Sequence, residues 1–208
     1  MRIPRTATVA ISVVTAAAWL LTAIVGADES AAMVMGIIPA RLSGLVDLAP
    51  AVPAWLTPLS STLVHGGFLH VALNLLMLVW CGTLVERVLG SSSLVLLYLI
   101  GAYAAALAQW AVDPASFVPV IGASGAISAV MGAFALSYGQ QKRIVRSEGL
   151  NRLLNALWLL AAWIVLQLLI GTIAGMQGFL LATPAHVGGF IAGLALQRPL
   201  LLWRYRGA

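Results

Sequence analysis

Long apolar runs alternate with short polar connections along the whole chain. Each of six runs is about long enough to cross a hydrocarbon core of about 30 Å as a helix. Backbone polar groups in lipid must find partners inside their own segment, so a spanning run has to be helical. The expected helices are 7–27, 68–85, 94–112, 122–139, 153–175 and 184–202. The pattern predicts an all-α, polytopic membrane bundle of six transmembrane helices.

Composition agrees with this prediction. Hydrophobic residues make up 62% of the 208 residues and charged residues only 8%, whereas about a quarter of a soluble domain is charged. The basic residues lie in short clusters between apolar runs, which argues against a nucleic-acid surface. Cys81, the single cysteine, lies within an apolar run and cannot form an internal disulfide.

Charge also predicts the orientation. With six crossings and a cytoplasmic N-terminus, all basic residues except Arg41 face the cytoplasm, as does the C-terminus. The first run also resembles a signal peptide, since Arg2 and Arg5 precede it and the small pair Gly26-Ala27 ends it. An uncleaved first span fits the charge distribution better.

The whole chain, 1–208, is expected to form one six-span domain without a separate soluble part. Residues 28–67 form a long external loop, apolar enough to place short helices in the membrane interface. Residues 140–152 form a basic cytoplasmic loop. We expect a multi-pass protein of the cell membrane.

The unusual polar residues gather at the outer ends of the second, fourth and sixth spans, which all run inward. They are His65, His70 and Asn74 in the second, Ser124 in the fourth and His186 in the sixth. At about 1.5 Å per residue, Ser124 and His186 both lie submerged at similar depth, His186 about 10 Å below the outer surface. Ionisable groups at that depth indicate a functional site.

Ser124 and His186 are the natural reactive pair. A serine hydroxyl becomes a nucleophile when a base within hydrogen-bond reach takes its proton, and no carboxylate lies inside a span to orient His186. The pair would be a dyad. The Ser124 N–H at its helix start, together with His70 and Asn74 on one helix face, could stabilise an oxyanion. His65 would lie near the entrance.

Small residues predict how the helices of this pair approach each other. Gly125 and Gly132 lie on one face of the fourth span, and Gly189 and Gly193 on one face of the sixth. Such spacing allows close backbone contact between membrane helices.

Four motifs together resemble the rhomboid family of intramembrane serine proteases. They are Gly122-Ala-Ser-Gly125, Ala185-His-Val-Gly-Gly189, the segment from His65 through His70 to Asn74, and Glu86-Arg-Val-Leu-Gly90. The resemblance covers nearly the whole chain from about residue 55.

This resemblance implies that Ser124 is the nucleophile, that His186 is the base, and that His70, Asn74 and the Ser124 N–H form the oxyanion hole. It implies cleavage of transmembrane substrates near the outer membrane face without metal or cofactor. Two features depart from some members: Trp55 is followed by leucine instead of arginine, and Ser128 stands where an aromatic residue would stack on the base.

Other interpretations remain open. His65, His70 and His186 could ligate zinc in a membrane hydrolase, although no acidic residue lies nearby to serve as base. An inactive relative would bind transmembrane helices without cutting them. For a protease, the loop before the sixth span is the expected gate, with Gly175, Gly178 and Phe179 as its flexible part.

Overall fold

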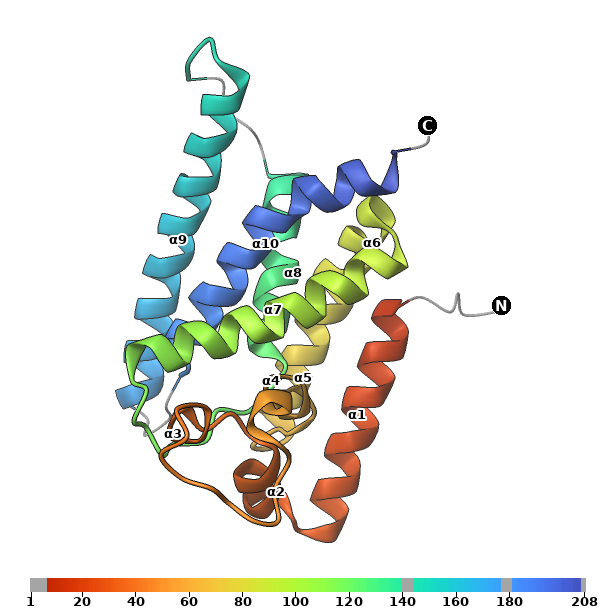
Figure 1. Cartoon of the computed structure of the whole chain (residues 1–208). Coiled ribbons are helices and arrows are strands. Elements are labelled where there is room, and N and C mark those ends of the chain that lie inside the picture. The colour runs from red at the N-terminus through yellow and green to blue at the C-terminus, as the bar shows by residue number, and fades with distance from the viewer. Residues whose placement is uncertain (1–6, 140–143, 177–180, 207–208) are drawn as a thin grey trace, which may run out of the picture.

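A computed structural model describes residues 7–139, 144–176 and 181–206, and the regular elements in these ranges are all helical. In chain order they are α1 (Ala7–Val25), α2 (Asp28–Met35), α3 (Pro39–Leu42), η1 (Ala54–Leu56), α4 (Thr57–Ser60), η2 (Ser61–Leu63), α5 (Phe68–Met77), η3 (Leu78–Gly82), α6 (Thr83–Leu89), α7 (Ser91–Val112), α8 (Ser124–Tyr138), α9 (Glu148–Met176) and α10 (Thr183–Arg204). Figure 1 shows α1 and α9 at opposite edges of the bundle, with α7, α8 and α10 between them.

Within the described ranges, five helical stretches are long and apolar enough to cross a membrane: α1, the continuous run α5–η3–α6, α7, α9 and α10. The prediction of an all-α, multi-pass membrane bundle is confirmed. The expected fourth span is shorter than predicted, because α8 has 15 residues and a length of about 22 Å. The number of crossings therefore stays a prediction.

The second span contains an irregular middle. η3 is a π-helical turn between α5 and α6, and its last residue, Gly82, lies against Thr8 of α1. The span ends at Gly90, whose φ of 85° favours glycine, and α7 begins directly after it.

A buried carboxylate joins the end of this span to the start of α1. Glu86 accepts the backbone N–H groups of Ala7 (2.7 Å) and Thr8 (3.0 Å), as well as the Thr8 hydroxyl (2.6 Å). It also accepts the Ser91 hydroxyl at 2.6 Å. The first N–H groups of a helix have no partner inside the helix, so Glu86 supplies one from the neighbouring element.

Glycine allows α7, α8 and α10 to pack closely in the centre. A side chain at Gly189 would collide with the carbonyl oxygen of Gly125, and one at Gly193 with that of Ala129. Gly132 meets the carbonyl oxygen of Phe190 in the same way. This contact between α8 and α10 brings the first turns of the two helices side by side.

The segment 28–67 contains α2, α3, α4, η1 and η2, which gather at one end of the bundle (Figure 1). Ile37 and Val120 form an isolated antiparallel bridge. The buried Arg41 donates through Nη2 to the carbonyl oxygen of Val52 at 2.8 Å. The Gly122 N–H donates to the carbonyl oxygen of Ser61 at 2.9 Å. These bonds hold the loop over the turn that leads into α8.

Candidate active site

Ser124 and His186 meet at the start of α8 and α10. The Oγ atom of Ser124 and the Nε2 atom of His186 are 2.7 Å apart, and His186 is buried. Both residues lie in the first turn of their helices, and the glycine contacts described above bring these turns together. This is the distance at which an imidazole can accept the proton of a serine hydroxyl.

The turn before Ser124 requires glycine. Gly122 has a φ of 107°, and a Cβ atom there would lie 2.6 Å from Nε2 of His70. Any side chain would meet both a backbone conformation unfavourable for L-residues and the His70 ring. This close approach places the His70 ring beside the turn that presents Ser124.

The hydrogen bonds of His70 indicate its tautomer. The Gly66 N–H donates to Nδ1 of His70 at 3.4 Å, so Nδ1 acts as an acceptor and the ring proton is on Nε2. Because Nε2 is the atom that borders Gly122, the ring directs a donor toward the turn before Ser124.

His65 lies just before α5, buried beside the turn that leads to Ser124, and its place near the entrance stays a prediction. Its side chain has no exposed surface; its Nε2 accepts the Ala123 N–H at 3.4 Å, and its ring meets that of His70 edge-on at 5.0 Å. Burial, helped by the nearby His70, lowers the pKa of His65 to about 4. A neutral His65 therefore supports the turn that precedes Ser124.

Asn74 is buried one turn after His70 on α5. Its Nδ2 donates to the carbonyl oxygen of His70 at 2.9 Å. The second N–H of this amide is the donor left for another acceptor.

Gln167 of α9 was missed by the sequence analysis. Its Oε1 lies 2.7 Å from Nδ1 of His186, and the side chain is only 4% exposed. Because Nδ1 faces a carbonyl oxygen, it carries the ring proton, which leaves Nε2 as an acceptor for Ser124. The expectation that unusual polar residues lie only at the outer ends of three inward spans was therefore wrong. The signal was available, since Gln167 is a polar residue inside an apolar run.

An aromatic pair next to Gln167 also holds α9 against α10. Trp163 stacks on Phe190 with ring centroids 4.8 Å apart and planes 9° apart. Its indole N–H donates to the carbonyl oxygen of His186 at 3.3 Å. Ser128, which replaces the expected aromatic residue, donates to the carbonyl oxygen of Ser124 at 2.8 Å. The orientation of His186 therefore comes from α9 and not from the next turn of α8.

Ring nitrogens of all three histidines form hydrogen bonds with other groups of the protein. His186 is bonded at both ring nitrogens, and one nitrogen each of His65 and His70 accepts a backbone N–H. Within the described ranges, no three His, Cys, Asp or Glu side chains form a group that could hold a metal ion.

The expected gate lies mostly outside the part of the chain that the structure describes. Gly178 and Phe179 fall in the segment 177–180, which is not described. Gly175 lies exposed in the last turn of α9, and a Cβ atom there would meet nothing within 4 Å. The role of this loop stays a prediction.

Comparison with known proteins matches residues 53–203 to the rhomboid domain. Rhomboid protease GluP from Bacillus subtilis (strain 168) is 30% identical over 140 residues, which are 67% of this chain and 25% of the relative. RHOMBOID-like protein 5 from Arabidopsis thaliana is 31% identical over 139 residues, 67% of this chain and 42% of the relative. Rhomboid protease GlpG from Klebsiella pneumoniae (strain 342) is 30% identical over 139 residues, 66% and 45% respectively. The chain thus spans between a quarter and a little under half the length of these relatives.

Proposed function

The chain belongs to the rhomboid family, and from this premise we propose that it is an intramembrane serine endopeptidase that cuts transmembrane proteins near the outer membrane face. The observation that carries the proposal is the 2.7 Å contact between Ser124 Oγ and His186 Nε2. This contact joins a nucleophile to a base in a bundle of helices that are long and apolar enough to cross a membrane.

In the first step Ser124 attacks the carbonyl carbon of the scissile peptide bond. The Oγ–C bond forms, the carbonyl electron pair moves to its oxygen, and the Oγ proton passes to Nε2 of His186. The imidazolium that forms donates through Nδ1 to the amide oxygen of Gln167, 2.7 Å away. A hydrogen bond from a charged donor is about twice as strong as a neutral one, so Gln167 stabilises the transition state more than the resting state.

The oxyanion needs donors that are already in place. We propose the Ser124 N–H, Nε2–H of His70 and the free N–H of the Asn74 amide. The first lies at a helix start, where backbone N–H groups lack intrahelical partners. The second is supported by the Gly66 bond to Nδ1 of His70, which leaves the ring proton facing the turn.

The intermediate then collapses. The C–N bond breaks, and His186 gives its proton to the leaving amine. Water attacks the resulting ester, its proton passes to Nε2, and the Oγ–C bond breaks with return of the proton to Ser124. The net reaction consumes one water per peptide bond, and we propose that it needs no metal or other cofactor.

The short α8 supports a site below the membrane surface. A helix of about 22 Å in a core of about 30 Å leaves room above Ser124, and the chain before it is non-helical from Asp113 to Ile121 apart from one bridge. We further propose six crossings, both termini in the cytoplasm and residence in the cell membrane. The basic residues of the connections support this orientation.

Substrate entry is proposed to occur beside α9. This helix contacts α10 at few places, among them Trp163 against Phe190 and Gly171 beside Thr183. The last turn of α9 with Gly175, together with Gly178 and Phe179 in the segment that follows, would open the way to the dyad. Tethering Gly178 to the outer end of α5 should then slow cleavage, and full activity of the tethered protein would contradict this gate.

One experiment distinguishes the proposed protease from the two alternatives, an inactive helix-binding relative and a metal-dependent hydrolase. The full chain is reconstituted in liposomes with a model transmembrane substrate, and cleavage is compared among wild type, Ser124→Ala, His186→Ala and Ser128→Ala. Ser128 is the matched control, because its hydroxyl donates to a carbonyl oxygen of its own helix. We expect cleavage by wild type and Ser128→Ala alone.

Wild-type protein that binds the substrate without cutting it would indicate an inactive helix-binding relative. Cleavage that survives Ser124→Ala but is lost with a chelator would indicate the histidine-ligated metal hydrolase.

A further inference from the structure

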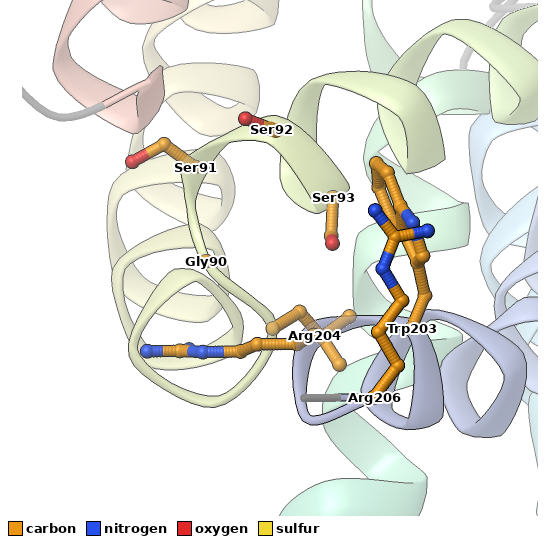
Figure 2. A pocket seen from close by; sticks show the side chains of 8 residues that line it. Gly90, Ser91, Ser92, Ser93, Trp203, Arg204 and Arg206 are labelled. Atoms are coloured by element: carbon orange, nitrogen blue, oxygen red, sulfur yellow. The ribbon is translucent and has the colours of Figure 1, made fainter. Parts of the chain in front are cut away.

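A groove opens at the end of the bundle opposite α2 and α3, between the α6–α7 turn and the last turns of α10 (Figures 1 and 2). Its volume is about 450 Å³, within the range of small-molecule sites. It is lined by Leu89, Gly90, Ser91, Ser92, Ser93, Trp203, Arg204 and Arg206. The proposed catalytic residues take no part in it.

The charged groups that line this groove are both cationic. Arg204 donates one N–H to the carbonyl oxygen of Arg87 at 2.7 Å and keeps the rest of its guanidinium donors. The Arg206 guanidinium lies 5.6 Å from the centre of the Trp203 ring. Glu86, the nearby carboxylate, is buried and bonded to the start of α1 and to Ser91.

A serine hydroxyl faces the same space. Ser93 is 3% exposed, and Figure 2 shows its oxygen in the groove beside the Arg206 side chain. Ser93 lies in the first turn of α7, a helix of 22 residues, where backbone N–H groups and the helix dipole favour an anion.

We propose that this groove binds the phosphate of an anionic phospholipid. A phosphate ester offers charge to the two arginines and acceptor oxygens to Ser93 and the start of α7. The helices beside the groove expose apolar side chains suited to acyl chains: Leu96 and Leu99, each 38% exposed, and Leu202, 60% exposed. Leu96 and Leu99 follow Ser92 at helical spacing and share its exposed face. This combination of phosphate site and apolar flank distinguishes a lipid from a soluble phosphate.

The test measures lipid binding by native mass spectrometry of the full chain in detergent. Phosphatidylglycerol is compared with phosphatidylcholine of the same acyl chains, and with glycerol 3-phosphate as the soluble phosphate. The variants are Arg206→Gln alone and Ser93→Ala with Arg206→Gln. Arg146→Gln is the matched control, because it removes one exposed positive charge outside the groove. Binding needs no proteolysis, so the Ser124→Ala protein must bind equally well.

We expect phosphatidylglycerol to bind more tightly than phosphatidylcholine. The double variant should raise the dissociation constant for phosphatidylglycerol about tenfold, Arg206→Gln alone should raise it less, and Arg146→Gln should leave it within about twofold. Equal affinity for the two lipids, or equal weakening by Arg146→Gln, would overturn the site in favour of diffuse attraction. Glycerol 3-phosphate binding as tightly as the lipid would overturn the lipid assignment.

Discussion

Gln167 offers the sharpest test of how the base is held. Its amide oxygen lies 2.7 Å from Nδ1 of His186, in a contact that is buried on both sides. Gln167→Met keeps a side chain of similar length and removes the acceptor. His186 is then free to turn or to expose the wrong nitrogen to Ser124.

The size of the effect follows from the charge that develops on the ring. A hydrogen bond to a charged group contributes about 1.5–3 kcal/mol, against about 1 kcal/mol for a neutral pair. The difference of about 0.5–2 kcal/mol raises the barrier, and since about 1.4 kcal/mol is a factor of ten in rate, Gln167→Met should lower kcat by about 2- to 30-fold. KM should change little, because the bond strengthens in the transition state and not on substrate binding.

The assay is cleavage of a reconstituted transmembrane substrate, with kcat and KM determined separately. Gln167→Glu retains an oxygen acceptor and should keep more of the activity than Gln167→Met. The matched control is Gln197→Met, which removes a bond from α10 to Ser137 of α8, at 3.2 Å, away from His186. Full kcat in Gln167→Met, or an equal loss in Gln197→Met, would refute the positioning role.

Three further predictions concern stability. The pKa of His65 is about 4 in the folded protein and about 6.5 in the unfolded chain. Its contribution to the free energy of unfolding is therefore present above about pH 6.5 and is lost as the pH falls toward 4. Between these limits wild type should lose about 3 kcal/mol more than His65→Gln, measured by chemical unfolding in detergent; parallel pH curves would contradict this. Gly189→Ala should destabilise the protein by about 1–3 kcal/mol, because the added methyl group meets a backbone carbonyl. Gly175→Ala is the control and should not destabilise it, because the space around Gly175 is open. Equal melting temperatures of the two variants would disprove the close contact. Glu86→Gln should lower the free energy of unfolding by about 1–3 kcal/mol, because charged hydrogen bonds to the start of α1 are lost. Glu29→Gln, at an exposed position, is the control. An unchanged stability of Glu86→Gln would show that Glu86 does not cap α1.

The apolar pattern predicted the helices well, because lipid leaves the backbone few choices. The expected runs 68–85 and 184–202 correspond to Phe68–Leu89 and Thr183–Arg204. The expected run 122–139 agrees with α8 (Ser124–Tyr138) to within two residues at each end. Local backbone irregularity, such as the π turn in the second span, leaves no comparable pattern in the sequence.

In the candidate site, too, some residues could be predicted from the sequence and others could not. Ser124 and His186 could be paired from charge and depth, because the charge pattern predicts that both lie at the outer ends of inward-running spans. Gln167 could not be assigned to them, because its contact depends on how α9 is rotated and packed against α10. The burial of His65 was likewise set by the turn at Gly122 and Ala123, which packs against it from a distant part of the chain.

The central claim is that His186 activates Ser124, and covalent labelling with a fluorophosphonate tests it most directly. The folded protein is labelled in detergent, and the modified residue is identified by peptide mass spectrometry. We expect one adduct on Ser124, lost in His186→Ala and unchanged in Ser128→Ala. A Ser124 that remains unlabelled in wild type, or one that reacts equally well without His186, would contradict it.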